Sequence, residues 1–119
     1  MARAPIELLA DLLDSAKRIR EYTRSGRSAF VKSPMIRDAV VARLIQIGEA
    51  VKAAEAAGVG LAELAPEVPW KRVAGMRDIL SHQYWRIDAD IVWGVVANDL
   101  RPLEAAARKL RARLQAKRR

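Results

Sequence analysis

Residues able to do acid–base chemistry near neutral pH are scarce in this sequence, and they gather in one short run. The 119 residues include a single histidine, His82, and no cysteine. The lack of cysteine excludes thiol catalysis, disulfides and cysteine-ligated metal sites. A lone histidine is also a poor zinc site, because zinc takes three or four ligands. His82 is therefore the main candidate for a general acid or base.

Polar residues accompany His82 in the run from Arg77 to Tyr84. At about 100° per residue, Arg77 and Tyr84 fall on nearly the same side of a helix, inside an apolar arc. An arginine there is costly unless its charge meets a partner or an anion. Arg77 and His82 are about 140° apart around such a helix. The two therefore reach one point only if the helix bends or ends near His82, or if two copies meet across a twofold axis.

Each of these residues also has a structural interpretation. An arginine at the edge of an apolar stripe commonly extends to water, and a single helical histidine is commonly exposed. Asp78, four residues before His82, could orient the imidazole, which is the hypothesis we adopt, or it could pair with a nearby arginine. Trp85 could stack on a substrate base, although such residues more often close a core or a subunit contact.

The spacing of apolar residues predicts the helices that position this run. A first helix begins at Pro5 and continues to about Tyr22, and residues 24–28 form a turn. Ser33 caps a second helix that stops near Gly58, a residue type that terminates helices well.

The second half of the chain follows the same logic. A short turn is expected at residues 61–64, a helix from Pro69-Trp70 to about His82, and a further helix capped by Asp88. Pro102 predicts a break near residues 98–101. The sequence thus predicts an all-α protein, an antiparallel bundle of four to five helices in a single domain, 1–119, with a basic helical tail over about 101–119.

The formal net charge of +8 is concentrated at the C-terminal end. Residues 101–119 carry a net +7, and the remaining residues carry +1. A second basic cluster, opposed by Glu21, consists of Lys17, Arg18, Arg20, Arg24, Arg27 and Lys32. Such clusters attract polyphosphate, or they are solvated helix ends, and the sequence leaves both open. No signal-peptide pattern or apolar run near 20 residues is present, so we expect a cytoplasmic protein that does not enter membranes.

The run Arg77-x4-His82-x-Tyr84 resembles the R-x4-H-x-Y signature of the HepT-like branch of HEPN ribonuclease toxins, also called domain of unknown function 86. Other segments resemble the helices of that family in the same order, so the resemblance covers nearly the whole chain. These segments are 37–40, 47–51, 69–70, 74–78, 87–88, 91–93 and 98–100. One departure is Asp78, where the family often has asparagine.

The resemblance implies a homodimer with the motif at its interface that cleaves RNA, possible targets including tRNA, without a metal or cofactor. By position, Arg77 would hold the scissile phosphate, and His82 would act as general acid or base for attack by a 2′-hydroxyl or by water. The protein would be the toxin of a type VII-like toxin–antitoxin system. An MntA-type minimal nucleotidyltransferase antitoxin would silence it by attaching adenylate to Tyr84, which places phosphate over Arg77.

Two other classes of function compete with this interpretation. The bundle could be a non-catalytic nucleotide- or nucleic-acid-binding partner subunit of a nucleotidyltransferase; the intact pair of Arg77 and His82 favours the enzyme. A DNA-binding regulator would need a recognition helix rich in base-reading residues, whereas residues 70–82 are mostly apolar.

Overall fold

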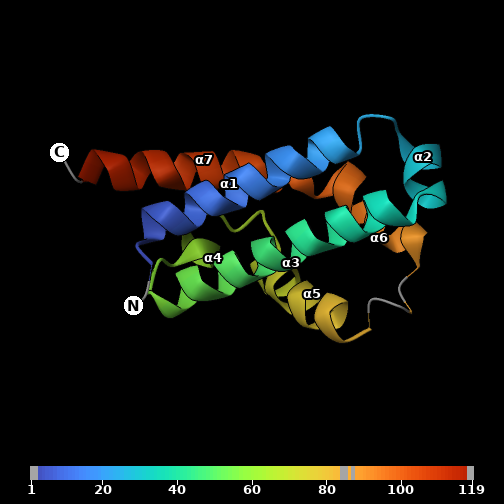
Figure 1. Ribbon diagram of the computed structural model, residues 1–119. Coiled ribbons are helices and arrows are strands. Elements are labelled where there is room, and N and C mark those ends of the chain that lie inside the picture. Colours follow the sequence, from blue (N-terminus) through green and yellow to red (C-terminus); the bar gives the residue numbers. More distant parts are fainter. Residues whose placement is uncertain (1–2, 84–85, 87, 118–119) are drawn as a thin grey trace.

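The computed structural model describes residues 3–83, 86 and 88–117, and its regular structure is helical throughout (Figure 1). The elements are α1 (Pro5–Tyr22), α2 (Arg27–Lys32), α3 (Pro34–Ala56), α4 (Leu61–Leu64), α5 (Trp70–Gln83), α6 (Ala89–Asn98) and α7 (Leu100–Lys117). The prediction of an all-α bundle is confirmed, with α1, α3, α5, α6 and α7 as its longer helices. No described helix combines the length and hydropathy needed to cross a membrane.

Helix α3 is central to the arrangement. It packs against α1 and against α5, and α1 in turn packs against α7. Figure 1 shows α1 and α7 side by side and antiparallel, with the start of α1 and the end of α7 at the same end of the molecule. The buried side chains between these helices include Leu9, Leu12, Ile19, Leu44, Ile47, Val51, Leu100 and Leu110. The α5 helix that carries the motif is therefore positioned mainly by its contact with α3.

The predicted helix boundaries rest on local capping, and most are confirmed. Helix α1 begins at Pro5 and ends at Tyr22. The Ser33 hydroxyl accepts a hydrogen bond from the Ile36 amide at 3.2 Å, which caps α3. The carboxylate of Asp88 accepts one from the Asp90 amide at 2.8 Å and caps α6.

Three local details differ from the sequence prediction or refine it. Residues 24–28 were predicted as a turn, but α2 begins at Arg27, after Gly26 adopts a φ of 91°. This six-residue helix buries only Phe30, so it leaves no periodic pattern to recognise. The break near Pro102 is confirmed at Asp99, between α6 and α7. Pro102 itself lies in the first turn of α7, where a missing amide donor costs nothing.

The basic C-terminal segment is part of the packed structure rather than an appendage. In its first half, Leu103, Ala107 and Leu110 are buried against the bundle. Glu104 is buried as well, and its carboxylate pairs with Arg20 of α1 and Arg108 of α7. The cations of α7 are consequently held on a surface that the core fixes in place.

Candidate active site

Helices α3 and α5 pack closely at Gly48. A Cβ atom added to Gly48 would lie 2.5 Å from the Arg77 Cβ and 3.2 Å from the Val73 carbonyl oxygen. Only glycine permits this contact, because real Cβ atoms do not approach other atoms so closely. The close approach places the first residue of the motif, Arg77, directly on the surface of α3.

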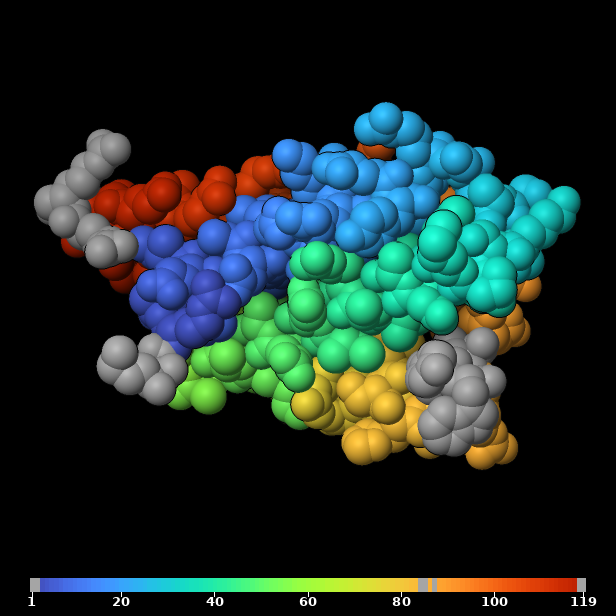
Figure 2. All heavy atoms as spheres, viewed as in Figure 1, coloured from blue at the N-terminus to red at the C-terminus, as the bar shows by residue number. Residues whose placement is uncertain are grey.

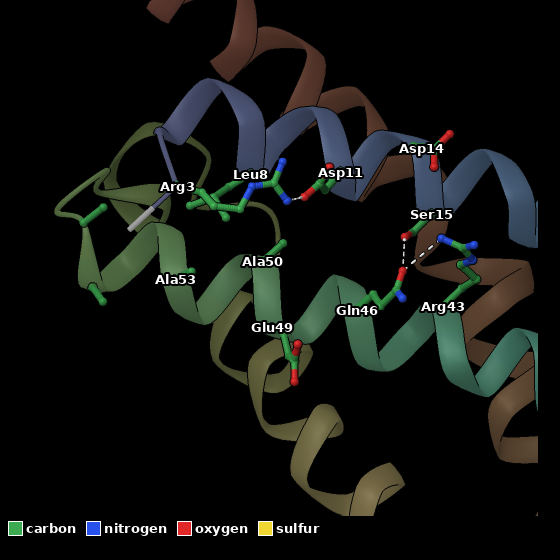
Figure 3. Close-up of a pocket in the computed structure, with 12 residues that line it drawn as sticks. Arg3, Leu8, Asp11, Asp14, Ser15, Arg43, Gln46, Glu49, Ala50 and Ala53 are labelled. Carbon is green, nitrogen blue, oxygen red and sulfur yellow. Dashed lines mark hydrogen bonds and ion pairs between the residues drawn. The ribbon is translucent and has the colours of Figure 1, made fainter. Parts of the chain in front are cut away.

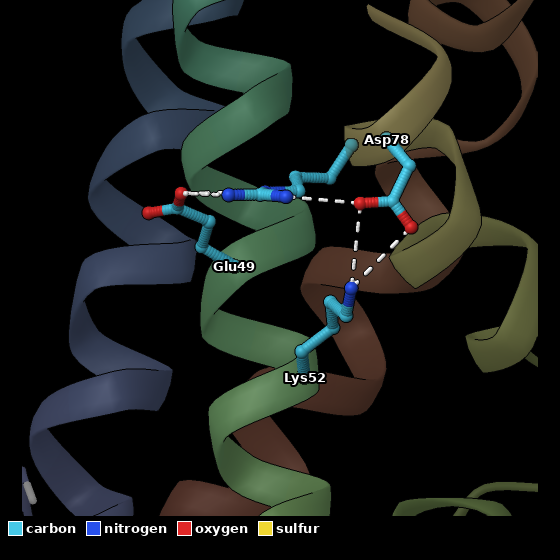
Figure 4. A network of polar contacts seen from close by, with 4 residues as sticks. Glu49, Lys52 and Asp78 are labelled. Carbon is cyan, nitrogen blue, oxygen red and sulfur yellow. Dashed lines mark hydrogen bonds and ion pairs between the residues drawn. The ribbon is translucent and has the colours of Figure 1, made fainter. Parts of the chain in front are cut away.

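The Arg77 guanidinium is held by carboxylates from both helices. Its Nη2 and Nε donate to Glu49 Oε1 at 3.1 and 3.3 Å, and its Nη1 donates to Asp78 Oδ1 at 2.9 Å. Lys52 Nζ lies 3.3 Å from Asp78 Oδ2. Figure 4 shows Glu49 and Lys52 on α3 facing Asp78 on α5. These two carboxylates and two cations form a network without net charge, which we call the Arg77 network; its members are Glu49, Lys52, Arg77 and Asp78.

Hydrogen bonding within this network shifts the titration of its members. The hydrogen bond from Arg77, followed by that from Lys52, lowers the pKa of Asp78 below its ordinary value. The hydrogen bonds to Asp78 and then to Glu49 raise the pKa of Arg77. The Asp78 carboxylate is therefore ionised at neutral pH, and it loses its charge only below the usual range for aspartate. The Arg77 side chain as a whole remains one-third exposed, so part of it is open to solvent.

His82 lies on the exposed surface of α5. The helix runs unbroken from Trp70 to Gln83, so Arg77 and His82 keep the separation of about 140° expected for a regular helix. Within the described residues no hydrogen bond joins His82 to Arg77 or to Asp78. The orienting role that we predicted for Asp78 is therefore not seen as a contact in this chain. Tyr84 and Trp85 lie outside the described residues.

Sequence reasoning missed Glu49 and Lys52, which hold the network from α3. Their positions relate simply to the crossing that the structure shows: Glu49 directly follows Gly48, and Lys52 lies three residues further along the same face. Nothing in the sequence alone states which face of α3 meets Arg77. The crossing point at Gly48 supplies that information.

The sequence-based expectation that Arg77 binds RNA phosphate predicts that Asp78→Asn lowers the KM for RNA several-fold with little change in kcat, since it removes one of the two carboxylates that neutralise Arg77. A role in orienting His82 would instead reduce kcat, so slower turnover at saturating RNA would contradict the expectation. Steady-state cleavage kinetics measures both quantities. Asp38→Asn makes the same chemical change at an exposed position near the start of α3 and serves as the control.

A polar hollow between α1 and α3 lies next to the Arg77 network. Figure 3 shows Ser15 and Arg43 pointing toward Gln46, whose Oε1 accepts hydrogen bonds from them at 3.3 and 2.9 Å. Glu49 borders both this hollow and the guanidinium of Arg77. Three carboxylates line the hollow against two arginines: Asp11, Asp14 and Glu49 against Arg3 and Arg43. This charge disfavours a polyanion in the hollow.

Comparison with known proteins gives consistent matches over most of the chain. Residues 12–110 match the family model described as Ribonuclease HepT-like. The chain is 38% identical to "Putative RNase MJ1380" of Methanocaldococcus jannaschii, over 77% of this chain and 83% of that protein. It is 33% identical to "Probable ribonuclease HepT" of Thermococcus cleftensis, over 93% of this chain and 99% of the relative.

A larger relative places the same region beside another activity. The M. jannaschii protein named "Gamma-glutamylcyclotransferase and putative RNase MJ0434" is 35% identical over 86% of this chain, which spans only 45% of that relative. No solved structure matches the chain.

Proposed function

Because the chain belongs to the HepT-like ribonuclease family, we propose that it is the toxin of a type VII-like toxin–antitoxin system, an endoribonuclease that works without a metal ion. One observation carries the proposal. The Arg77 guanidinium is held at the α3–α5 contact, the side chain remains one-third exposed, and the same helix carries the only histidine of the sequence. An arginine and an imidazole supply what phosphodiester cleavage needs, namely charge stabilisation and proton transfer.

In the proposed reaction, Arg77 binds the scissile phosphate and stabilises the negative charge that builds in the transition state. Glu49 and Asp78 hold the guanidinium in position. When the phosphate binds, some of the guanidinium N–H groups exchange these carboxylates for phosphate oxygens. The attacking oxygen, a 2′-hydroxyl or water, forms a bond to phosphorus and gives up its proton as the bond to the leaving oxygen breaks. His82 takes or gives one of these protons, and His82 of a second copy of the chain supplies the complementary transfer.

Cleavage in the presence of a chelator tests this proposal. We expect the purified protein to cut RNA in excess EDTA, because the proposed chemistry uses only Arg77 and His82. RNA with a 2′-deoxy substitution at the cut site distinguishes attack by the 2′-hydroxyl, which it blocks, from attack by water. The alternative, a non-catalytic subunit that only binds nucleic acid, predicts binding without products.

An exposed apolar face beside the motif supports a homodimer. Ile79 on α5 and Ile91 on α6 are 57% and 67% exposed, and both line an apolar groove between these helices together with Met76 and Val95. Exposed apolar surface of this kind marks contact sites between proteins. Ile79 lies three residues before His82, so both occupy the same side of α5. A second copy that covers Ile79 would bring its own α5 close to His82.

We expect Ile79→Glu to convert the dimer to a monomer and to abolish cleavage, since a buried unpaired carboxylate at the contact is strongly unfavourable. Light scattering after gel filtration gives the mass, and RNA cleavage gives the activity. Met35→Glu is the matched control, because Met35 is 79% exposed at the start of α3, away from α5. A monomeric Ile79→Glu protein with full activity would contradict the placement of the site at the interface.

Silencing by adenylylation belongs to the same proposal. Tyr84 follows Arg77 by seven residues, and helical spacing would put both on nearly one side of the helix. An adenylate on the tyrosine would then offer its phosphate to the guanidinium that RNA needs. Incubation with an MntA-type nucleotidyltransferase and ATP should add adenylate to Tyr84 and stop cleavage, and Tyr84→Phe should escape both effects.

A further inference from the structure

We propose that the contact between α1 and α7 forms a second surface for RNA, one that binds the sugar-phosphate backbone of a long substrate away from the α5 motif. This surface, the basic seam, consists of Lys17, Arg20, Arg24, Arg101, Arg108 and Arg111. The inference deepens the proposed function, because it assigns the size of substrate that the ribonuclease takes.

A buried carboxylate builds the centre of the basic seam. The Glu104 side chain is only 4% exposed, and its Oε2 lies 2.9 Å from Arg20 Nη2 and 3.3 Å from Arg108 Nη2. The two arginines come from different helices and remain 49% and 58% exposed. Glu104 therefore holds two guanidiniums at one carboxylate oxygen, while about half of each arginine side chain stays exposed. Donors fixed in advance bind phosphate with less loss of conformational entropy than free side chains do.

The burial of Glu104 also changes the charge that α7 shows to solvent. Glu104 is the only acidic residue between Leu100 and the C-terminus, so the exposed charges of described α7 are all positive. At about 100° per residue, Arg101, Arg108 and Arg111 all fall within about 60° of Glu104 around the helix. These cations consequently follow the flank of α7 that faces α1.

Helix α1 contributes the other half of the basic seam. Four charged residues line one shallow hollow at its end: Lys17, Arg20, Glu21 and Arg24. The cations outnumber the single acid, in contrast to the acidic hollow between α1 and α3. The two basic clusters of the sequence therefore meet, because antiparallel packing brings the end of α1 beside the beginning of α7 (Figure 1).

The location of the seam sets the length of RNA that can use it. Helix α3 packs against both α1 and α5, so it lies between the basic seam and the motif. The molecule measures 47 × 27 × 27 Å. At roughly 3.4 Å per nucleotide along a strand, 27 Å corresponds to about eight nucleotides. Figure 2 shows the blue surface of α1 and the yellow surface of α5 separated by the green surface of α3. An RNA of a few nucleotides is much shorter than the molecule is wide, whereas a long or folded RNA can extend from Arg77 to the seam.

The binding test uses the Arg77→Ala protein, so that cleavage does not interfere, and a fluorescent RNA of about 30 nucleotides. The seam variant combines Lys17→Gln, Arg24→Gln and Arg111→Gln, which leaves the contacts of Glu104 intact. Loss of three phosphate contacts should reduce the slope of log K against log salt by about 2 and weaken binding by about tenfold near 0.1 M salt. The control variant combines Lys71→Gln, Lys109→Gln and Arg113→Gln, which removes equal charge elsewhere, two of the three from the other flank of α7. Equal slopes and affinities for the two variants would overturn the proposal.

Cleavage kinetics separates this inference from the proposed function. In a protein that keeps Arg77 and His82, the three seam substitutions should raise the KM for the long RNA about tenfold and leave cleavage of a dinucleotide unchanged. If the seam and control variants have the same KM for the long RNA and the same KM for the dinucleotide, the RNA-binding role of the seam is refuted while the ribonuclease proposal stands. Seam-dependent binding without any cleavage by the unaltered protein would refute the ribonuclease while the seam stands.

Discussion

His82→Ala is expected to lower kcat for RNA cleavage by about 10²–10⁴-fold while RNA affinity changes little, because the imidazole transfers a proton and does not hold the phosphate. The side chain is exposed on α5, so its removal leaves the core intact. Arg77→Ala should lower kcat by about 10²–10³-fold, since it removes charge stabilisation from the transition state. Single-turnover cleavage of a labelled RNA measures these rates.

A mixing experiment determines whether the two residues act within one chain or between chains. If a dimer site joins Arg77 of one copy with His82 of the other, mixed dimers of the two single variants contain one site that has Arg77 and one His82, although the second imidazole of the proposed reaction is absent. Cleavage should then return in part when the inactive Arg77→Ala and His82→Ala proteins are mixed and allowed to exchange subunits. If subunits are shown to exchange but cleavage does not return, Arg77 and His82 must act together within one chain.

Gly48→Ala is expected to reduce the free energy of unfolding by about 1–3 kcal/mol, the usual cost of overpacking a close contact. The added Cβ would meet the Arg77 Cβ at 2.5 Å, the Val73 carbonyl oxygen at 3.2 Å and the Arg77 Cα at 3.3 Å. Because these atoms belong to the backbone or lie next to it, α5 as a whole must move away from α3. Denaturant unfolding measures the loss of stability.

The matched control for this prediction is Gly94→Ala in α6. A Cβ there meets nothing within 4 Å, so the change should stabilise the helix by up to about 1 kcal/mol. Gly48→Ala should also reduce cleavage, because displacement of α5 separates Arg77 from Glu49. A Gly48→Ala protein as stable as Gly94→Ala, with full activity, would contradict the role of this crossing.

The helix boundaries could be predicted from the sequence because they depend on local signals such as caps and prolines. Capping by Ser33 and Asp88, the proline at the start of α1 and the break before Pro102 each depend on neighbouring residues only, and each is found in the structure. Helix α2 was missed because its six residues bury one side chain, Phe30, and so show no periodicity.

The candidate site was predicted less completely, because its geometry depends on a tertiary contact. The motif positions Arg77 and His82 on one helix, and helical geometry gave their angular separation. The identity of Glu49 and Lys52 as partners depends on where α3 crosses α5, which no local pattern encodes. The meeting of two basic clusters across α1 and α7 likewise depends on antiparallel packing, and the buried position of Glu104 could not be read from a run of charged residues.

The neutrality of the Arg77 network has a consequence for how ionic strength acts on the protein. Phosphate that reaches Arg77 displaces carboxylates of the protein itself, not ions from the solution. These carboxylates act as built-in counterions, so little salt is released at this step. Added salt should therefore weaken the binding of long RNA to the basic seam far more than it weakens the chemical step. A dinucleotide should be cut at nearly the same rate in dilute and concentrated buffer.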